Sequence, residues 1–399
     1  MARDPVIIVG AGPAGLALAV SLLQRDVAVV VVEAEPALTL DLRAGTFHPP
    51  TLELLETIDV TAEFLSIGIF VPRWQIRDRH EGVIVEWDLS LLADETRYPF
   101  RFHCEQFKLT PILYRRLQAL GGAVRFGHTF KDAIQDADGV TARVETAGGI
   151  ERLRGSFLVG ADGGRSAVRQ TMGVAFEGFT WPERFLVVGT EYDFAQHGYT
   201  PNAYIADPVD WSAIFKMPGE RVGLWRIVSP TNAELPEEEV LAPSFAESRL
   251  QNFQPRPVPY EVIAKSLYRV HQRVAENFRA GRLLIVGDAA HVNNPLGGFG
   301  LNGALHGAFN LAEKLAPVWR GEAEASLLDL YVRQRRAANL GFVQAQSIRN
   351  KELLQERDPA VRQAHFDELR RIAADRARQK EFLMRSSMIL SVRHAASIA

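Results

Sequence analysis

The sequence predicts an α/β protein in which a parallel-sheet domain is joined to an antiparallel sheet and followed by a helical segment. Apolar runs lead directly into glycine-rich turns three times, within residues 6–15, 157–166 and 283–302. Between 184 and 269 apolar and polar residues alternate, which is typical of half-buried strands. After Ser326 the chain is highly charged, with apolar residues at helical spacing.

The chain is long enough for more than one hydrophobic core, because it has 399 residues and 47% apolar composition. We predict two domains, of which the first is discontinuous. The first domain comprises residues 1–72, 97–180 and 271–325. The sheet domain comprises a hairpin at 73–96 and residues 181–270, and 326–399 form the helical segment.

Composition excludes some classes of protein. The net charge of -3 gives no support for nucleic-acid binding. The single cysteine, Cys104, excludes an internal disulfide framework and fits a reducing compartment. The apolar run after Pro5 is soon broken by glycines, so neither a signal peptide nor a membrane span is indicated. We therefore expect a soluble cytoplasmic protein with no membrane or nucleic-acid partner and no metal.

The first element is a strand at 6–9, followed by the turn Gly10-Ala11-Gly12-Pro13-Ala14-Gly15 and a helix. Gly10 permits the tight turn, Gly12 lets a pyrophosphate reach the helix N-terminus, and Gly15 lets helix and strand pack closely. A second buried strand, 27–32, ends in Glu33, which can hold a ribose hydroxyl. This Rossmann-like unit predicts dinucleotide binding, and the acid favours FAD or NAD over NADP.

The next segments connect this unit to the sheet. Arg43 is either a phosphate ligand or a solvated surface residue. A helix opens at Pro49, and alternation from Arg73 to Trp87 predicts a hairpin. A second helix is predicted from Gln106 to Leu120, with short strands near Val124, Val140–Val144 and Ile150–Leu153.

Two further strand ends carry acids. Asp162 follows the apolar run 157–160 in a glycine turn, and it marks either a plain turn or a second strand end that faces a ligand. Asp288 follows the run 283–286 and can accept hydrogen bonds from a polyol hydroxyl. The loop with Gly297, Gly298 and Gly300 lets the backbone approach a flat ligand, and the helix that starts near Asn302 favours an anionic ring edge. A turn between two core elements is the alternative.

The predicted antiparallel sheet contains strands at Phe185–Tyr192, Trp211–Met217, Val222–Val228 and Glu261–Val270, with a helical interval near Glu237–Leu250. It carries a set of aromatic residues, Tyr192, Tyr199, Tyr204, Trp211, Phe215 and Trp225. Each belongs either to the core or to the floor of a cavity for an aromatic ligand between the domains.

The pattern of the C-terminal segment predicts helices that lie at the protein surface. Within 351–380, 14 of 30 residues are charged, and Phe366, Leu369 and Ile372 recur at helical spacing. One face therefore packs, either within the chain or in a homodimer.

Three motifs in this order resemble those of the single-component FAD-dependent aromatic hydroxylases of the para-hydroxybenzoate hydroxylase fold. They are Gly10-Ala11-Gly12-Pro13-Ala14-Gly15, Gly160-Ala161-Asp162-Gly163-Gly164-Arg165-Ser166, and Gly287-Asp288-Ala289-Ala290-His291 with the loop from Pro295 to Asn302. The resemblance covers residues 1 to about 320. His306-Gly307-Ala308 stands where many relatives have an acid, and the thioredoxin-like domain of the larger phenol hydroxylases is missing.

The resemblance implies the following residue roles. Gly10, Gly12, Ala14, Gly15 and Glu33 would hold the adenosine diphosphate of FAD, and Arg43 and Gln106 its phosphates and ribityl region. Asp162 would serve both FAD and the nicotinamide coenzyme, and Asp288 the ribityl chain. Pro295 would lie beside the reactive edge of the flavin, with the amides of Gly300, Leu301 and Asn302 facing its pyrimidine ring.

The implied reaction is hydroxylation of a small aromatic compound by O2, in which NADH or NADPH reduces FAD and a flavin C4a-hydroperoxide delivers the oxygen. We predict a base or hydrogen-bond acceptor near the ring hydroxyl, with His48, Tyr204 and His291 as candidates against purely structural roles. The alternatives are a flavin-dependent dehydrogenase or reductase without oxygen insertion and an FAD-binding redox sensor. The aromatic substrate and the choice of coenzyme are not predicted.

Overall fold

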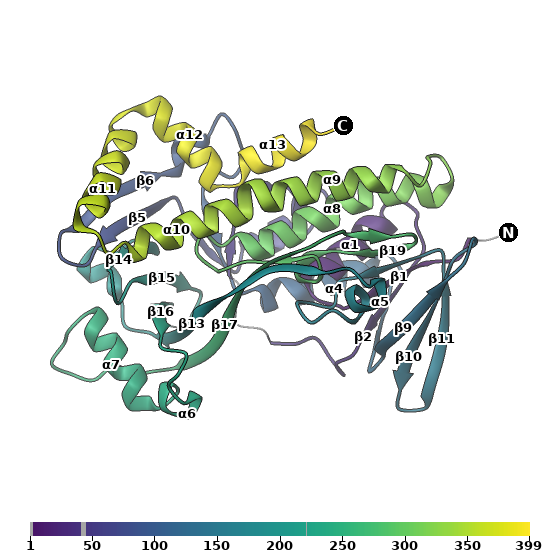
Figure 1. The fold of residues 1–399 in the computed structure, drawn as a ribbon, viewed down its shortest axis with the longest axis horizontal. Coiled ribbons are helices and arrows are strands. Elements are labelled where there is room, and N and C mark those ends of the chain that lie inside the picture. The colour runs from purple at the N-terminus through teal and green to yellow at the C-terminus, as the bar shows by residue number, and fades with distance from the viewer. Residues whose placement is uncertain (1–2, 41–44, 221) are drawn as a thin grey trace.

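The computed structural model describes residues 3–40, 45–220 and 222–399. It contains a six-stranded sheet, an eight-stranded sheet and two three-stranded sheets. Figure 1 shows two long helices, α8 (Phe299–Arg320) and α9 (Leu327–Ala338), side by side over the six-stranded sheet. The predicted mixed α/β class is thus confirmed, with a helical C-terminal region after α9.

The six-stranded sheet is built around β1, whose four residues are all buried. Its order is β18-β19-β12-β1-β2-β8, and only the β18–β19 pair is antiparallel. The strands are β1 Val6–Val9, β2 Val29–Glu33, β8 Val124–Phe126, β12 Phe157–Gly160, β18 Arg279–Ala280 and β19 Leu283–Ile285. The helices near this sheet are α1 Pro13–Leu23, α4 Gln106–Ala119 and α5 Ala167–Met172, besides α8 and α9. The continuous apolar strands fit a parallel sheet covered on both faces.

The eight-stranded sheet has the order β20-β17-β13-β16-β15-β14-β5-β6. The strands are β5 Arg73–Asp78, β6 Gly82–Asp88, β13 Phe176–Thr190, β14 Asn202–Ala206, β15 Ser212–Met217, β16 Leu224–Thr231, β17 Ala264–Ala275 and β20 His291–Val292. The predicted hairpin is present as β5 and β6, and it joins this sheet because β5 pairs with β14. The domain boundaries stay a prediction.

Several elements differ from the sequence predictions. Strand β14 was not predicted, because its five residues are all buried and so do not alternate. The helical interval near Glu237–Leu250 is two helices, α6 (Glu237–Val240) and α7 (Pro243–Phe253), since Pro243 starts a new helix. The strand predicted at Glu261–Val270 is β17, which begins at Ala264 and continues to Ala275.

The remaining small elements surround the two main sheets. One three-stranded sheet comprises β3 Thr46–Phe47, β7 Arg101–His103 and β4 Ile69–Val71; the other comprises β9 Thr129–Gln135, β10 Val140–Thr146 and β11 Gly149–Gly155. Strand β9 was not predicted. The short helices are α2 Pro49–Glu56, α3 Thr61–Leu65, η1 Leu89–Leu92, η2 Phe194–His197 and η3 Gly287–Ala289.

The C-terminal helices pack on the chain itself. They are the π-helical turn η4 Asn339–Gln344, then α10 Ala345–Gln355, α11 Pro359–Ala374, α12 Arg376–Ser386 and α13 Ile389–Ser397. Figure 1 shows α11 and α12 beside the β5–β6 hairpin, and Phe366 and Leu369 are buried in one cluster with Trp87. Among the described residues, no helix has the length and apolar composition needed to cross a bilayer.

Candidate active site

The three predicted strand ends meet at one edge of the six-stranded sheet. Strand β1 pairs in parallel with β12, and β12 with β19, so Val9 lies opposite Gly160 and Gly160 opposite Ile285. The turn after each strand therefore begins at the same level. Parallel strands place their carboxyl ends together, and ligands of open α/β sheets bind there.

The first turn is packed too tightly for side chains at two of its glycines. Gly10 has a φ of +105°, and a Cβ there would lie 2.5 Å from the Ala161 carbonyl oxygen. A Cβ on Gly15 would lie 2.0 Å from the Gly10 carbonyl oxygen. Gly12 differs, because a Cβ there would meet nothing within 4 Å. The space beside Gly12 belongs to a cleft that Ala14 also lines.

Glu33 is anchored at the end of β2. Its Oε2 accepts a hydrogen bond from the Ala11 amide at 2.7 Å, and its Oε1 accepts one from the Glu35 amide at 3.0 Å. These bonds fix the carboxylate beside the glycine turn while leaving further acceptor capacity on both oxygens. The predicted contact with a ribose hydroxyl is compatible with this geometry.

The third turn supplies much of the cleft wall. Asp288, Pro295, Gly300 and Leu301 line the cleft, and helix α8 starts there without a side-chain cap. Asn302 points elsewhere: its Nδ2 donates to the Thr46 and Gly298 carbonyls at 2.8 and 2.6 Å. Its side chain therefore ties the loop to β3, and the free amides at the helix start remain available to an anion.

The Asp162 side chain is directed at the start of helix α5, which follows it in the chain. Its Oδ1 accepts from the Ser166 hydroxyl at 2.6 Å, and its Oδ2 accepts from the Val168 amide at 3.1 Å. Burial raises the pKa of this carboxyl, although the hydrogen bond from Ser166 opposes that shift. The neighbours Ala161 and Gly163 line the cleft, whereas Asp162 is not among its lining residues. Direct contact of Asp162 with both cofactors thus stays a prediction.

The cleft has a volume of about 400 Å³ and lies between the two sheets. One side carries the three turns, together with Gln106 at the start of α4. The other side is the face of the eight-stranded sheet, with Val187, Phe215, Met217, Arg226, Val228 and Tyr268 to His271. This size and a lining that combines apolar residues with polar and charged groups are typical of small-molecule sites.

Only one of the six predicted aromatic residues lines the cleft. That residue is Phe215; Tyr204 and Trp211 belong to one packed cluster and Trp225 to another. Tyr268, which was not predicted, also lines the cleft. Alternation predicts two faces for a strand, but it does not say which face meets the ligand.

Arg226 is a buried charged residue of the cleft that sequence reasoning missed. It is 6% exposed, and its guanidinium lies 3.3 Å from Oε1 of Glu105, which is itself 3% exposed. Oε2 of Glu105 is 3.0 Å from Lys108 Nζ. On β16, Arg226 lies two residues before Val228, so both side chains are on the same face of the strand. A charged residue on an otherwise apolar face was the signal in the sequence that could have identified Arg226.

Comparison with known proteins identifies the family. A family model described as an FAD binding domain matches residues 3–346. The chain is 35% identical over 385 residues to the para-nitrophenol 4-monooxygenase of Pseudomonas sp. (strain WBC-3), which covers 96% of this chain and 94% of that protein. The chain belongs to the single-component FAD-dependent aromatic hydroxylases.

Solved structures agree with this assignment. The crystal structure of p-nitrophenol 4-monooxygenase PnpA from Pseudomonas putida DLL-E4 matches this hydroxylase with a TM-score of 0.92 at 31% identity, over 98% of each chain. A ternary complex of aklavinone-11 hydroxylase with FAD and aklavinone matches with a TM-score of 0.77 at 30% identity, over 89% of this chain and 69% of that one.

The residues of the hydroxylase fit FAD. Helices α1 and α8 both start at the cleft with a glycine N-cap and no side-chain cap, so their first amides can bind phosphate oxygens and the flavin ring edge. Gly12 leaves open space where a diphosphate can approach the backbone. Arg43, the predicted phosphate ligand, lies outside the described residues.

None of the three candidate bases lines the cleft, and two of them, His48 and Tyr204, hold the loop at Gly297. His48 Nε2 is 2.8 Å from the Gly297 carbonyl oxygen, and its ring stacks on Phe299 at a centroid distance of 5.6 Å. The Tyr204 hydroxyl accepts from the Gly297 amide at 3.1 Å. His291 is 2% exposed. The geometry therefore favours structural roles, and catalytic roles for these residues stay predictions.

Burial keeps these histidines neutral. Removal from water, with a smaller effect of nearby Arg101, lowers the pKa of His48 to about 3. Burial, followed by Arg335, likewise lowers the pKa of His291 to about 3. His306, whose Nε2 is 2.9 Å from the Thr51 hydroxyl, also has a pKa well below the ordinary value because of burial.

We expect the hydroxylase to lose stability as the pH falls. His48, His103 and His291 have pKa values of about 3 when folded and 6.5 when unfolded, so below pH 6.5 the unfolded chain binds more protons. The contribution of these three histidines to the free energy of unfolding is therefore fully present above pH 6.5, and it is lost progressively as the pH falls toward 3. At pH 5 the loss is about 2 kcal/mol for each histidine.

Urea unfolding at pH 7.5 and 5.0 measures this difference. The His103→Gln variant serves as the control, because it removes one titrating group and so should flatten the pH dependence. Equal unfolding free energies of the wild-type protein at the two pH values would contradict the prediction.

Proposed function

We propose that this hydroxylase inserts one oxygen atom of O2 into a small phenol that binds against the eight-stranded sheet, with NAD(P)H as reductant. The observation that carries this proposal is the composition of the cleft. Uncapped helix starts lie on one side, and an apolar and aromatic sheet face with one buried arginine lies on the other.

The residues at the strand ends would hold FAD along the edge of the parallel sheet. The amides after Gly12 would bind the diphosphate, Glu33 the adenosine ribose, and Asp288 the ribityl chain. The start of α8 at Gly300 and Leu301 would stabilise negative charge on the ring. When bound, FAD supplies hydride uptake from NAD(P)H and the activation of O2.

The phenol ring would lie between the Pro295 loop and the sheet. Phe215 and Tyr268 offer ring contacts, while Val187 and Val228 exclude water. Arg226 would face the phenolic oxygen and favour its anionic form, which makes the ring more electron-rich. Similarity to enzymes named for para-nitrophenol supports a para-substituted phenol as the substrate class.

The nicotinamide coenzyme would bind at the basic side of the cleft. Arg269 and His271 line it from β17, and Arg165, Arg269 and Arg273 all lie close enough to lower the pKa of His271, after burial, which is the largest cause. This concentration of positive charge suits a diphosphate.

We therefore expect Arg269→Gln to raise the KM for NAD(P)H about tenfold, with a smaller change in kcat, because one charge-assisted contact is lost. Steady-state kinetics at 20 and 200 mM salt measure it, and the variant should respond less to salt than the wild type. Arg256→Gln, on the loop before β17, is the control. An unchanged KM and salt response in Arg269→Gln would contradict a coenzyme contact.

A substrate screen tests the proposed function. Purified protein with FAD is offered para-substituted phenols, and NAD(P)H consumption, O2 uptake and product mass are measured. We expect a phenol that stimulates consumption and gains one oxygen. A product formed without oxygen insertion would favour a dehydrogenase or reductase, and bound FAD with no stimulated consumption would favour a redox sensor. A cytoplasmic location and a homodimer also stay proposals.

A further inference from the structure

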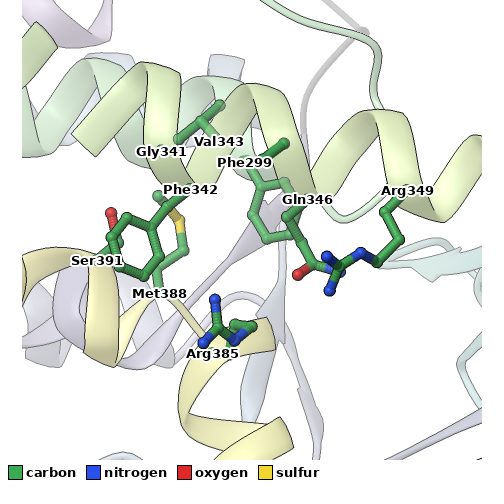
Figure 2. Close-up of a pocket in the computed structure, with 10 residues that line it drawn as sticks. Phe299, Gly341, Phe342, Val343, Gln346, Arg349, Arg385, Met388 and Ser391 are labelled. Atoms are coloured by element: carbon green, nitrogen blue, oxygen red, sulfur yellow. The ribbon is translucent and has the colours of Figure 1, made fainter. Parts of the chain in front are cut away.

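A second pocket lies on the far side of Phe299 from the cleft. It is a hollow of about 70 Å³ bounded by residues from α8, η4, α10, α12 and α13. Figure 2 shows Phe299 and Val343 above it, Phe342 and Met388 on one side, and Gln346 and Arg349 on the other. Phe299 also lines the main cleft, so one aromatic side chain forms a wall of both cavities.

The inner part of this second pocket is apolar. Phe299, Val343 and Met388 are each at most 2% exposed and form a small hydrophobic cluster of their own. The outer side is open, because Gly341, Arg349 and Arg385 are exposed. An apolar floor below an open polar rim suits a ligand with a ring and one polar end.

The rim is cationic. Figure 2 shows Arg349 from α10 extending toward Gln346 on one side of the pocket, and Arg385 from α12 at its lower edge, below Phe342 and Met388. None of the ten lining residues is acidic. Within the described part of the chain, no ion pair joins Arg349 or Arg385 to a carboxylate. The Arg385 guanidinium lies 5.8 Å from the centroid of the Phe342 ring.

Five other arginines of the C-terminal helices are already paired. Arg362, Arg370, Arg371, Arg378 and Arg393 each pair with a carboxylate, at Asp78, Glu81, Glu368, Glu368 and Glu95 respectively. The two arginines at the pocket are therefore cations that the surrounding helices leave available for an anion.

The backbone around the pocket is irregular on both sides. Gly341, Phe342 and Val343 belong to the π-helical turn η4, a rare conformation that is frequent at functional sites. Met388 has a φ of 64°, which costs energy for a residue with a side chain. These two irregularities place Phe342 and Met388 against the hollow.

We propose that this pocket is a second binding site, separate from the cleft, for a small aromatic anion such as a benzoate or a phenolate. The ring would lie on Phe299, Val343 and Met388, and the anionic oxygen would bind Arg349 and Arg385. This site does not depend on the proposed reaction, because its chemistry follows from the pocket itself.

Equilibrium dialysis of the FAD-loaded protein with benzoate tests the proposal. Binding in the cleft is followed separately through the flavin absorption spectrum. We expect the wild type to bind one benzoate more than the spectrum reports. The Arg349→Gln/Arg385→Gln variant should bind this additional benzoate at least tenfold more weakly, and Arg370→Gln/Arg371→Gln should bind it normally.

A second variant is designed to block the pocket while it keeps both Arg349 and Arg385. Gly341 lines the hollow and a Cβ there would meet nothing within 4 Å, so Gly341→Leu adds a bulky side chain at the hollow without a collision of its Cβ. We expect it to lose the additional benzoate while keeping FAD and cleft binding. Benzyl alcohol, which lacks the charge, should bind at least tenfold more weakly than benzoate. A wild type with no additional benzoate, unaltered binding in Gly341→Leu, or equal binding of benzyl alcohol would each overturn the proposal.

Discussion

Replacing Gly12 with valine is expected to give a folded but colourless protein. A Cβ at Gly12 meets nothing within 4 Å, and the backbone angles of Gly12, φ -71° and ψ 178°, suit any residue, so we expect the fold to tolerate the change. The added methyl groups occupy the space through which a diphosphate would reach the amides of α1. We expect FAD affinity to fall at least about 100-fold, which corresponds to about 2.7 kcal/mol.

Flavin absorbance after gel filtration measures the loss of FAD, and circular dichroism measures whether the fold is kept. Gly148→Val is a control in an exposed turn far from the cleft, where a Cβ lies 3.7 Å from its nearest neighbour. Gly15→Ala is a contrasting variant, because its Cβ collides with the Gly10 carbonyl and should destabilise the fold itself. A yellow Gly12→Val protein with wild-type affinity would mean that the diphosphate binds elsewhere.

Replacing Arg226 with glutamine is expected to lower kcat/KM for a phenol about 100-fold or more without loss of FAD. Without the buried cation, the phenolate form loses its stabilisation, and we expect the pH optimum to move upward toward the pKa of the free phenol. Arg226→Lys keeps the charge and should retain an intermediate rate.

Loss of Arg226 also leaves Glu105 buried with Lys108 as its remaining cationic neighbour, which should destabilise the protein by about 1–3 kcal/mol. The double variant Glu105→Gln/Arg226→Gln separates the two effects, because it should recover stability but not activity. Recovery of activity in the double variant, or a kcat/KM within threefold of wild type in Arg226→Gln, would rule out a substrate contact.

The comparisons with known proteins decide between the functional alternatives at the level of reaction class. The three ordered motifs indicated an FAD-dependent hydroxylase, and the FAD-binding family match over residues 3–346, with 35% identity to a para-nitrophenol 4-monooxygenase, confirms it.

The sequence by itself determined the parallel unit, the hairpin, the helical C-terminal segment and the three glycine-rich turns that follow the parallel strands. Gly10, Gly15 and Glu33 could be predicted because a tight turn and a strand end impose local requirements that a few residue types satisfy. Only the tertiary structure decided which side chains face the ligand. Tyr204 and His48 hydrogen-bond to Gly297 behind the Pro295 loop, and His291 is buried away from the cleft. Arg226 and Tyr268, in contrast, come from strands that pairing across the sheet brings to the cleft. Periodicity assigns a residue to one face of a strand, but the partner of that face is set by contacts between segments far apart in the chain.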